Sequence, residues 1–228
     1  MEENSLCEGS KSYHVEAHIY EQFCAAEDKP GKVQAFLLGL VQGKSVLDIG
    51  CGSGKYMALL APSAARYVGI DISQEQIALA AEKSKGMGNV ELICCSAEKI
   101  PLQDHSIDIV ISTWGVSTIL EPERRAQVLA EARRVLVPGG DIYLVENDYA
   151  GEFEYIRGRW PDASMTADYN NWLVQAGFAP VAHIATIFEF SSAPKAKHVF
   201  GAIWGAKAAE RVQRKKITHN IVVFKSTS

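Results

Sequence analysis

Three glycines at alternate positions follow an apolar run in the first quarter of the chain. The glycines are Gly50, Gly52 and Gly54, and the run before them carries one acid, Asp48. Glycine accepts positive φ angles and lets a ligand approach the backbone closely, so the pattern predicts a strand that turns through a tight loop into a helix. Dinucleotide sites use a different spacing, G-x-G-x-x-G, and hold a pyrophosphate at the helix N-terminus. Because the Asp48 carboxylate would repel a pyrophosphate, the run favours a ligand that carries a positive charge.

A second acid, Asp71, ends the next apolar run. It lies about 20 residues after the glycines, where α/β nucleotide sites place an acid that accepts hydrogen bonds from ribose hydroxyls. A carboxylate can accept from both hydroxyls at once. The alternative is that Asp71 only caps the following helix, but Ser73 is better placed for that. Asp71 is therefore predicted to bind a ribose, with Ile72 packed near the base.

These two stretches resemble motif I and the next acidic motif of the class I S-adenosylmethionine-dependent methyltransferases. Three later pieces fit the same family in the same order. Residues 94–102 resemble the turn after the third strand, residues 106–116 the end of the fourth strand, and residues 131–140 the helix and Pro-Gly-Gly turn before the fifth. The family's ligand carries a sulfonium and an ammonium group, which agrees with the acid in the glycine run. The resemblance covers residues 44–146 well and residues 181–225 in pattern only.

The resemblance implies S-adenosylmethionine as the cofactor and S-adenosylhomocysteine as its product. The residues that it assigns to cofactor binding are Asp48, Gly50, Cys51, Gly52, Gly54, Asp71, Ile72, Ser96, Ala97, Glu98, Ser112 and Trp114. Ser96 stands where the family has an acid, and a neutral hydroxyl is a weaker acceptor for the adenine amino group. Trp114 is expected to face the sulfonium through a cation–π contact. Cys94 and Cys95 lack the partners of a zinc site, so no metal ion is expected.

Strands and helices alternate in the elements that must position these residues. We expect strands over residues 45–49, 67–70, 90–94, 107–112, 142–145, 181–190 and 217–224, and helices over residues 12–27, 33–41, 55–60, 74–85, 121–136, 164–176 and 196–214. This alternation predicts a doubly wound α/β sheet with helices on both faces. The resemblance implies a Rossmann-like sheet of seven strands, mostly parallel, with an antiparallel last strand.

One domain is expected, in four parts. Residues 1–43 would form N-terminal lid helices, and residues 44–146 the cofactor-binding core. Residues 147–180 would form a substrate-side insertion, and residues 181–228 a C-terminal strand pair with a helix between the strands.

The end of the fourth predicted strand favours a small-molecule acceptor. Residues 112–115 read Ser-Thr-Trp-Gly, which is not the Asn/Asp-Pro-Pro-Tyr tetrad of similar DNA amino-methyltransferases. Family members cover their sites with segments that correspond here to residues 12–27 and 147–164. Candidate substrate contacts are Tyr13, Tyr20, Trp114, Asn147 and Tyr149. Methyl transfer is an in-line displacement that depends mostly on alignment and exclusion of water. Where the acceptor loses a proton, His14, His18 and Tyr20 are candidates to take it.

The composition limits the partners and the location. The chain has 228 residues, is 47% hydrophobic and carries a formal net charge of −4. A negative chain argues against nucleic acid as the main partner. The sequence shows neither an apolar run long enough to span a membrane nor a secretory signal at its acidic N-terminus. Its five cysteines, an odd number without regular spacing, indicate reduced thiols and a cytoplasmic location.

Two other functions stay open, and one is disfavoured. An RNA- or protein-modifying methyltransferase would use the same cofactor site, with the basic residues of segment 195–216 as its docking surface. A non-catalytic partner subunit would keep the fold, although it would have no need for an intact glycine run. A nicotinamide-dependent oxidoreductase is disfavoured by the glycine spacing and by Asp48. We expect a monomer or a homodimer, and the identity of the acceptor and of its methylated atom stays open.

Overall fold

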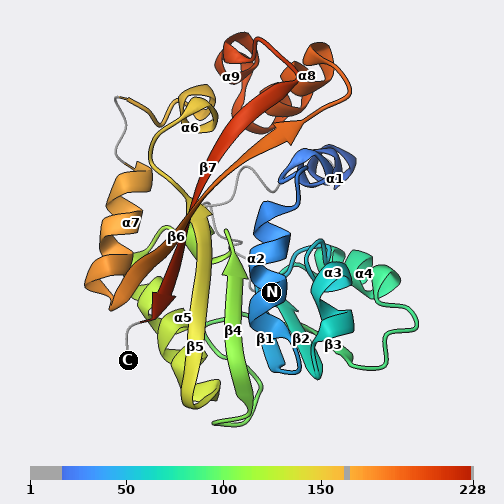
Figure 1. Ribbon diagram of the computed structural model, residues 1–228, viewed down its shortest axis with the longest axis vertical. Coiled ribbons are helices and arrows are strands. Elements are labelled where there is room, and N and C mark those ends of the chain that lie inside the picture. Colours follow the sequence, from blue (N-terminus) through green and yellow to red (C-terminus); the bar gives the residue numbers. More distant parts are fainter. Residues whose placement is uncertain (1–16, 162–164, 227–228) are drawn as a thin grey trace, which may run out of the picture.

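A computed structural model describes residues 17–161 and 165–226 of the chain. Within these ranges the centre of the molecule is a seven-stranded sheet in the order β3-β2-β1-β4-β5-β7-β6 (Figure 1). The strands from β3 to β5 pair in parallel, whereas β7 pairs antiparallel with both β5 and β6. The strands are β1 (Ser45–Ile49), β2 (Arg66–Asp71), β3 (Val90–Cys94), β4 (Ile107–Thr113), β5 (Leu136–Asn147), β6 (Phe178–Glu189) and β7 (Lys216–Ser226). The predicted fold class, mostly parallel with an antiparallel last strand, is confirmed.

Helices cover both faces of the sheet, which explains why its central strands are apolar on both sides. On one face α2 (Lys32–Val41) and α3 (Met57–Leu60) pack on β1 and β4. On the other face α5 (Pro122–Val135) and α7 (Met165–Gln175) pack on the same strands and on β7. Beside β2 and β3 lies α4 (Gln74–Lys83), whose N-cap is Ser73, as expected. In the two described ranges no helix is long and apolar enough to cross a bilayer.

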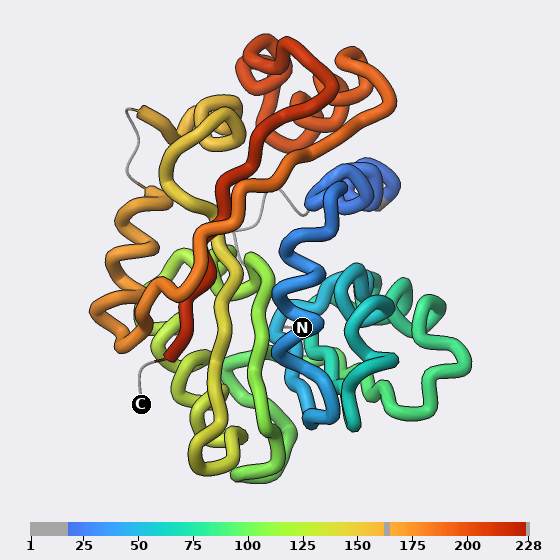
Figure 2. The backbone as a smooth tube through the Cα atoms, in the orientation of Figure 1, coloured from blue at the N-terminus to red at the C-terminus, as the bar shows by residue number. Residues whose placement is uncertain are grey.

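A third apolar core lies beyond the carboxyl ends of the parallel strands, and we call this unit the cap. It consists of α1 (Ala17–Ala26), α6 (Glu152–Arg157), α8 (Ala193–Trp204) and α9 (Ala206–Arg211), together with the paired ends of β6 and β7, residues 184–189 and 216–221. Its core is rich in aromatic rings, with Phe153, Phe188 and Phe200 in mutual contact. Figure 2 shows β6 and β7 running past the end of β5 to reach α8 and α9, with α1 beside them. The cap therefore covers the sheet edge at which α/β proteins bind ligands.

Several elements differ in extent from the prediction, each for a local reason. The helix expected over residues 196–214 is two helices, α8 and α9, because Gly205 between them has a φ of 87°. The helix expected from residue 55 begins at Met57, after the glycine turn. The fifth and sixth strands begin at Leu136 and Phe178, earlier than expected. In β6 the longer pairing with β7 accommodates Pro180 through a register shift.

Candidate functional site

The turn between β1 and α3 depends on its three glycines for different reasons. Gly50, Gly52 and Gly54 have φ values of 74°, 53° and 78°, which side chains disfavour. A Cβ on Gly50 would lie 3.0 Å from the Cα of Gly115, and one on Gly54 would lie 2.8 Å from the Cε of Met57. A Cβ on Gly52 would meet nothing closer than 3.8 Å. At Gly50 the obstacle is backbone and at Gly54 it is the end of the Met57 side chain, whereas Gly52 leaves its backbone open to a ligand.

Asp71 lies at the end of β2 and is tied to this turn. One carboxylate oxygen accepts the backbone N–H of Gly52 at 3.0 Å, and the other accepts that of Ser73 at 2.9 Å. Burial raises the pKa of Asp71, and these two N–H donors act in the opposite direction. The neighbouring Ile72 is 56% exposed, which is unusual for so apolar a side chain. The pair thus presents a carboxylate next to a bare apolar surface, as a nucleoside site requires.

Asp48 lies beneath the turn and is only 1% exposed. The Tyr67 hydroxyl donates to its Oδ2 at 2.7 Å, while its Oδ1 has no hydrogen-bond partner among the described residues. Burial raises the pKa of Asp48 to about 7. The predicted influence on a cationic ligand must therefore act through the turn and not by direct contact. The side chain of the adjacent Cys51 is also buried.

The side chains of the turn after β3 bond within the turn and to α5. The Ser96 hydroxyl accepts the backbone N–H of Glu98 at 3.2 Å. Glu98 in turn pairs with Arg124 of α5, whose guanidinium nitrogen lies 2.6 Å from a carboxylate oxygen. The methyl group of Ala97 packs against the core. Ser96 and Glu98 thus stabilise the turn, and their predicted contact with adenine stays a prediction.

The end of β4 carries Ser112 and Trp114 in contrasting states. Ser112 is fully buried and donates its hydroxyl to the Ile49 carbonyl at 2.8 Å, which ties β4 to β1. Its predicted cofactor contact stays a prediction, but this hydroxyl already has a partner within the protein. Trp114 is half-buried and has a φ of 58°, a conformation that non-glycine residues rarely adopt. Its indole N–H donates to the Asn147 side chain at 3.1 Å.

Comparison with known proteins agrees with this geometry. The methyltransferase domain family matches residues 47–144, which include most of β1, the glycine turn, Asp71 and the end of β4. Residues 47–144 thus form a methyltransferase domain, as the resemblance to the class I S-adenosylmethionine-dependent methyltransferases implied. The family match ends within β5, so the cap lies outside it.

Individual relatives are more distant. A demethylmenaquinone methyltransferase of Clavibacter sepedonicus is 29% identical over 174 residues, which are 63% of this chain and 69% of that protein. A tRNA (carboxymethyluridine(34)-5-O)-methyltransferase of Mus musculus is 29% identical over 170 residues, 68% of this chain but only 24% of that protein. The chain therefore spans a small part of its longer relatives. A methyltransferase structure from Aquifex aeolicus aligns with a TM-score of 0.61 at 19% identity, covering 92% of this chain and 97% of that one, which shows a shared fold.

The residues of this domain fit the cofactor of that family. Gly52 would provide an open backbone, Asp71 a ribose acceptor and Ile72 an apolar surface for the base. The unpartnered Oδ1 of Asp48 adds a buried acceptor below the turn. When bound, S-adenosylmethionine would supply an electrophilic methyl group on a positively charged sulfur. Among the described residues, no group of three or more His, Cys, Asp or Glu side chains could hold a metal ion.

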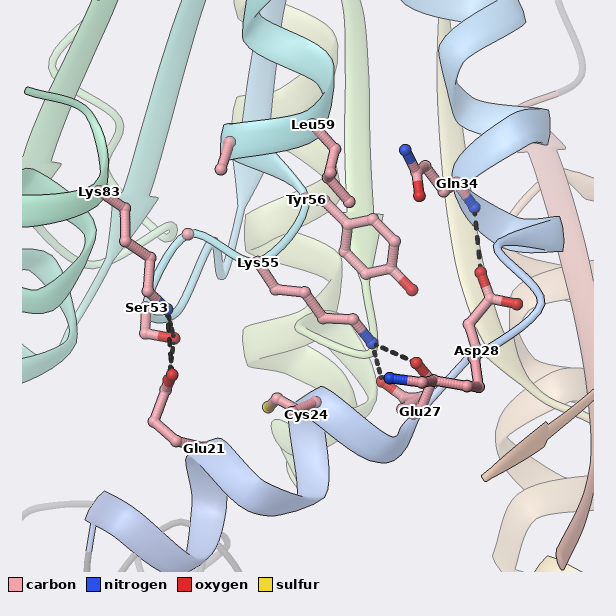
Figure 3. A pocket seen from close by; sticks show the side chains of 14 residues that line it. Glu21, Cys24, Glu27, Asp28, Gln34, Ser53, Lys55, Tyr56, Leu59 and Lys83 are labelled. Carbon is pink, nitrogen blue, oxygen red and sulfur yellow. Dashed lines mark hydrogen bonds and ion pairs between the residues drawn. The ribbon is translucent and has the colours of Figure 1, made fainter. Parts of the chain in front are cut away.

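Helix α1 and the turn after it contact the glycine turn through two glutamates, Glu21 and Glu27. Glu21 bonds to the Ser53 hydroxyl and pairs with Lys83, and Glu27 pairs with Lys55 at 3.0 Å. Figure 3 shows both glutamates pointing toward the glycine turn, Glu21 from α1 and Glu27 from the loop that follows α1. A cavity of about 320 Å³ lies between α1, α3 and this turn. Of the predicted cofactor residues, Gly54 lines it and Asp71 does not, so the cavity lies beside the cofactor site and is not the same place.

The other predicted acceptor-side residues are not all brought together. Trp114 and Asn147 are in contact, but Tyr149 is exposed on the loop that follows. Of the candidate proton acceptors on α1, His18 is exposed and Tyr20 packs on Phe23 at a centroid distance of 6.3 Å. The remaining candidates, Tyr13 and His14, lie outside the described residues.

Two buried residues near Trp114 were missed by the sequence analysis. His219 of β7 bonds to the Asn147 side chain at 2.8 Å. Glu146 of β5 accepts the Tyr169 hydroxyl at 2.9 Å, and burial raises its pKa to about 7. Both carried a signal. His219 has the inward parity of Ile217 and Ile221 along β7, and Glu146 is an acid directly after an apolar strand run.

Proposed function

We propose that this protein transfers a methyl group from S-adenosylmethionine to a small-molecule acceptor. The observation that carries the proposal is the cap, which places its aromatic core over the carboxyl ends of β4 and β5. Trp114, the predicted wall of the reaction site, is half-buried beneath it. A site covered by the cap suits a compact ligand better than a folded macromolecule.

The cap also suits the chemistry. An in-line displacement gains most of its rate from alignment of the reactants and from exclusion of water. The cap supplies apolar cover, and the strained Trp114 supplies a rigid ring that is held by Asn147. One relative, a demethylmenaquinone methyltransferase, is named for a small-molecule acceptor. Where the acceptor loses a proton, His18 and Tyr20 remain candidate bases on α1, together with His14.

A tRNA acceptor is the second candidate. Its support is the mouse tRNA methyltransferase, whose match extends over 68% of this chain and so includes more than the cofactor-binding core. The net charge of −4 counts against it, because RNA-binding domains normally carry a basic surplus. A monomeric or homodimeric state and a cytoplasmic location accompany the proposal as further predictions.

Two measurements test the proposal in sequence. Calorimetric titration with S-adenosylhomocysteine, with NADH as control ligand, tests the cofactor. One-to-one binding of the first and none of the second is expected; no binding of S-adenosylhomocysteine would move the non-catalytic partner subunit ahead. S-adenosylhomocysteine formation is then measured with a filtrate freed of protein and RNA, and separately with purified tRNA. Turnover with tRNA alone would replace the small-molecule acceptor by the second candidate.

A further inference from the structure

Five side chains lie in a row from the glycine turn to Trp114, joined by hydrogen bonds or ion pairs except for one longer gap between Glu27 and His219. Lys55, next to Gly54, lies with its Nζ 3.0 Å from the Oε2 of Glu27, the residue directly after α1. The Oε1 of Glu27 lies 3.9 Å from the Nδ1 of His219 on β7. The Nε2 of His219 lies 2.8 Å from the Oδ1 of Asn147, which also accepts the indole N–H of Trp114. The row joins five segments that are far apart in the sequence.

His219 is the central member and is completely buried. Its ring stacks on Phe188 at a centroid distance of 4.7 Å and on Trp114 at 5.8 Å, with interplanar angles of 22° and 24°. Burial lowers the pKa of His219 well below its usual value, and the positive charges of Arg157 and Lys55 act in the same direction. The imidazole is therefore neutral and carries one proton.

The neighbours decide which nitrogen carries that proton. An indole nitrogen can only donate a hydrogen bond, so the Asn147 atom that it faces must be the amide oxygen. The Nε2 of His219 faces the same oxygen and must also donate. The proton is therefore on Nε2, and Nδ1 is a bare acceptor. Nδ1 has no hydrogen-bond partner among the described residues, because 3.9 Å to Glu27 is too long.

Glu27 makes this arrangement sensitive to the position of the turn that follows α1. Its carboxyl group is buried, and burial raises its pKa while Lys55 lowers it. A carboxylate that came within hydrogen-bond distance of Nδ1 would draw the proton to that nitrogen. The Asn147 oxygen would then lose one of its two donors, and Trp114 would lose the residue that fixes its partner. The position of Glu27 and the position of Trp114 are thus linked through the same histidine.

The alternative is that His219 only fills space in the aromatic core. Packing alone would be satisfied by any flat ring and would place no demand on a tautomer. Asn147 Oδ1 receives donors from both Trp114 and His219, and Nδ1 faces Glu27 without a hydrogen bond. A phenylalanine could not supply the donor from His219.

We propose that His219 is a positioning residue whose Nε2–H tautomer holds Asn147 and Trp114 in place, and that Glu27 couples this arrangement to the cofactor turn through Lys55. The proposal rests on the proposed function for the meaning of the Trp114 position, but its geometry is a property of the free protein. Cofactor binding at the glycine turn is then coupled to the position of Trp114 on the acceptor side.

The first test reads the tautomer directly. In protein labelled with ¹⁵N-histidine, the His219 ring signals are assigned by their loss in His219→Gln. We expect a neutral ring with the proton on Nε2 and no titration between mildly acidic and mildly alkaline pH. A ring protonated at Nδ1, or one that titrates in this range, would overturn the proposal.

The second test separates positioning from packing by measuring how fast the Trp114 indole N–H exchanges with water. Trp114→Phe assigns the signal. The amide nitrogen of glutamine stands near the place of Nε2, whereas the shorter asparagine does not reach it. His219→Gln should keep the wild-type exchange rate, and His219→Asn should raise it about tenfold, the effect of losing one hydrogen bond. Equal behaviour of two folded variants would reduce His219 to a packing residue. If His219→Asn does not fold, the tautomer measurement on the wild type still decides.

The third test addresses the coupling and uses two glutamates that both contact the glycine turn, Glu21 on α1 and Glu27 just after it. Adding S-adenosylhomocysteine should slow indole exchange at Trp114 in the wild type. The slowing should disappear in Glu27→Ala and persist in Glu21→Ala, because Glu21 contacts Ser53 and Lys83 but not His219. Loss in both variants, or in neither, would refute the coupling. If S-adenosylhomocysteine does not bind at all, the proposed function fails, while the first two tests on the free protein remain decisive for His219.

Discussion

The Asp71 carboxylate accepts the backbone N–H of Gly52 at 3.0 Å, so the end of β2 is joined to the middle of the glycine turn. The same carboxylate also accepts the N–H of Ser73 at the start of α4. Asp71 therefore shapes the turn, and it is also the residue predicted to bind the ribose. A change at this position affects the site in two ways at once.

Replacing Asp71 by alanine should weaken S-adenosylhomocysteine binding by about 1–3 kcal/mol, the cost of losing hydrogen bonds to a charged group. Calorimetric titration measures the change. Asp108→Ala is the matched control, because the Asp108 carboxylate also accepts a backbone N–H, that of Ser45, at the opposite end of β1. Unchanged affinity in folded Asp71→Ala would remove Asp71 from the cofactor site.

Gly52→Ala should weaken the binding of S-adenosylhomocysteine in addition to lowering the stability of the protein. The new Cβ has open space but must adopt a φ of 53°, a strain on the order of 1 kcal/mol or more. Gly139→Ala is a matched control, since Gly139 has a φ of 81° and equally open space at the start of β5. Both variants should lose similar stability in denaturant titration, and only Gly52→Ala should lose affinity for S-adenosylhomocysteine. Equal affinities would place the ligand away from Gly52. The bulkier Gly52→Val should abolish binding.

Ser112→Ala should act on stability and leave cofactor affinity nearly unchanged. The hydroxyl is fully buried and donates to the Ile49 carbonyl, so its removal leaves that oxygen without its side-chain donor, at a cost of about 1–3 kcal/mol. Chemical unfolding and calorimetric titration separate the two effects. A large loss of affinity at modest loss of stability would instead support the predicted contact between Ser112 and the cofactor.

Glu146 should make the protein less stable as the pH rises. Burial raises its pKa from the ordinary value of 4.5 to about 7 in the folded state. Because the folded-state pKa is raised, the contribution of Glu146 to stability is complete below about pH 4.5. It decreases as the unfolded chain loses its proton and is gone once the pH has passed about 7. The free energy of unfolding should therefore fall over this range, by up to about 3 kcal/mol from this group.

Glu146→Gln should flatten that fall, because the amide cannot ionise but can still accept the Tyr169 hydroxyl. Denaturant titrations at a series of pH values measure the slope, and Glu123→Gln, at an exposed position on α5, is the control. Part of the slope should remain, since burial raises the pKa of Asp48 to about 7 as well. A Glu146→Gln curve parallel to that of the wild type would show that Glu146 does not titrate in this range.

The sequence by itself determined which segments form strands and where the glycine turn lies, and it carried the resemblance to the methyltransferase family. These features depend on neighbours in the chain, since alternate glycines dictate a turn and continuous apolar runs dictate buried strands. Residues 45–49 and 90–94 were therefore predicted with their correct bounds. Even Ser73 could be assigned as a helix cap, because its hydroxyl acts on an N–H three residues away.

Only the tertiary structure decided how the acceptor side is built. Asn147 and His219 are 72 residues apart and meet because β7 inserts antiparallel beside β5, with Asn147 opposite Ile221. Glu27 reaches His219 only because α1 folds over the same edge of the sheet. Burial, which no local pattern fixes, sets the charge states of Asp48 and His219. Long-range pairing and desolvation are properties of the assembled fold, so these contacts could not be derived from spacing along the chain.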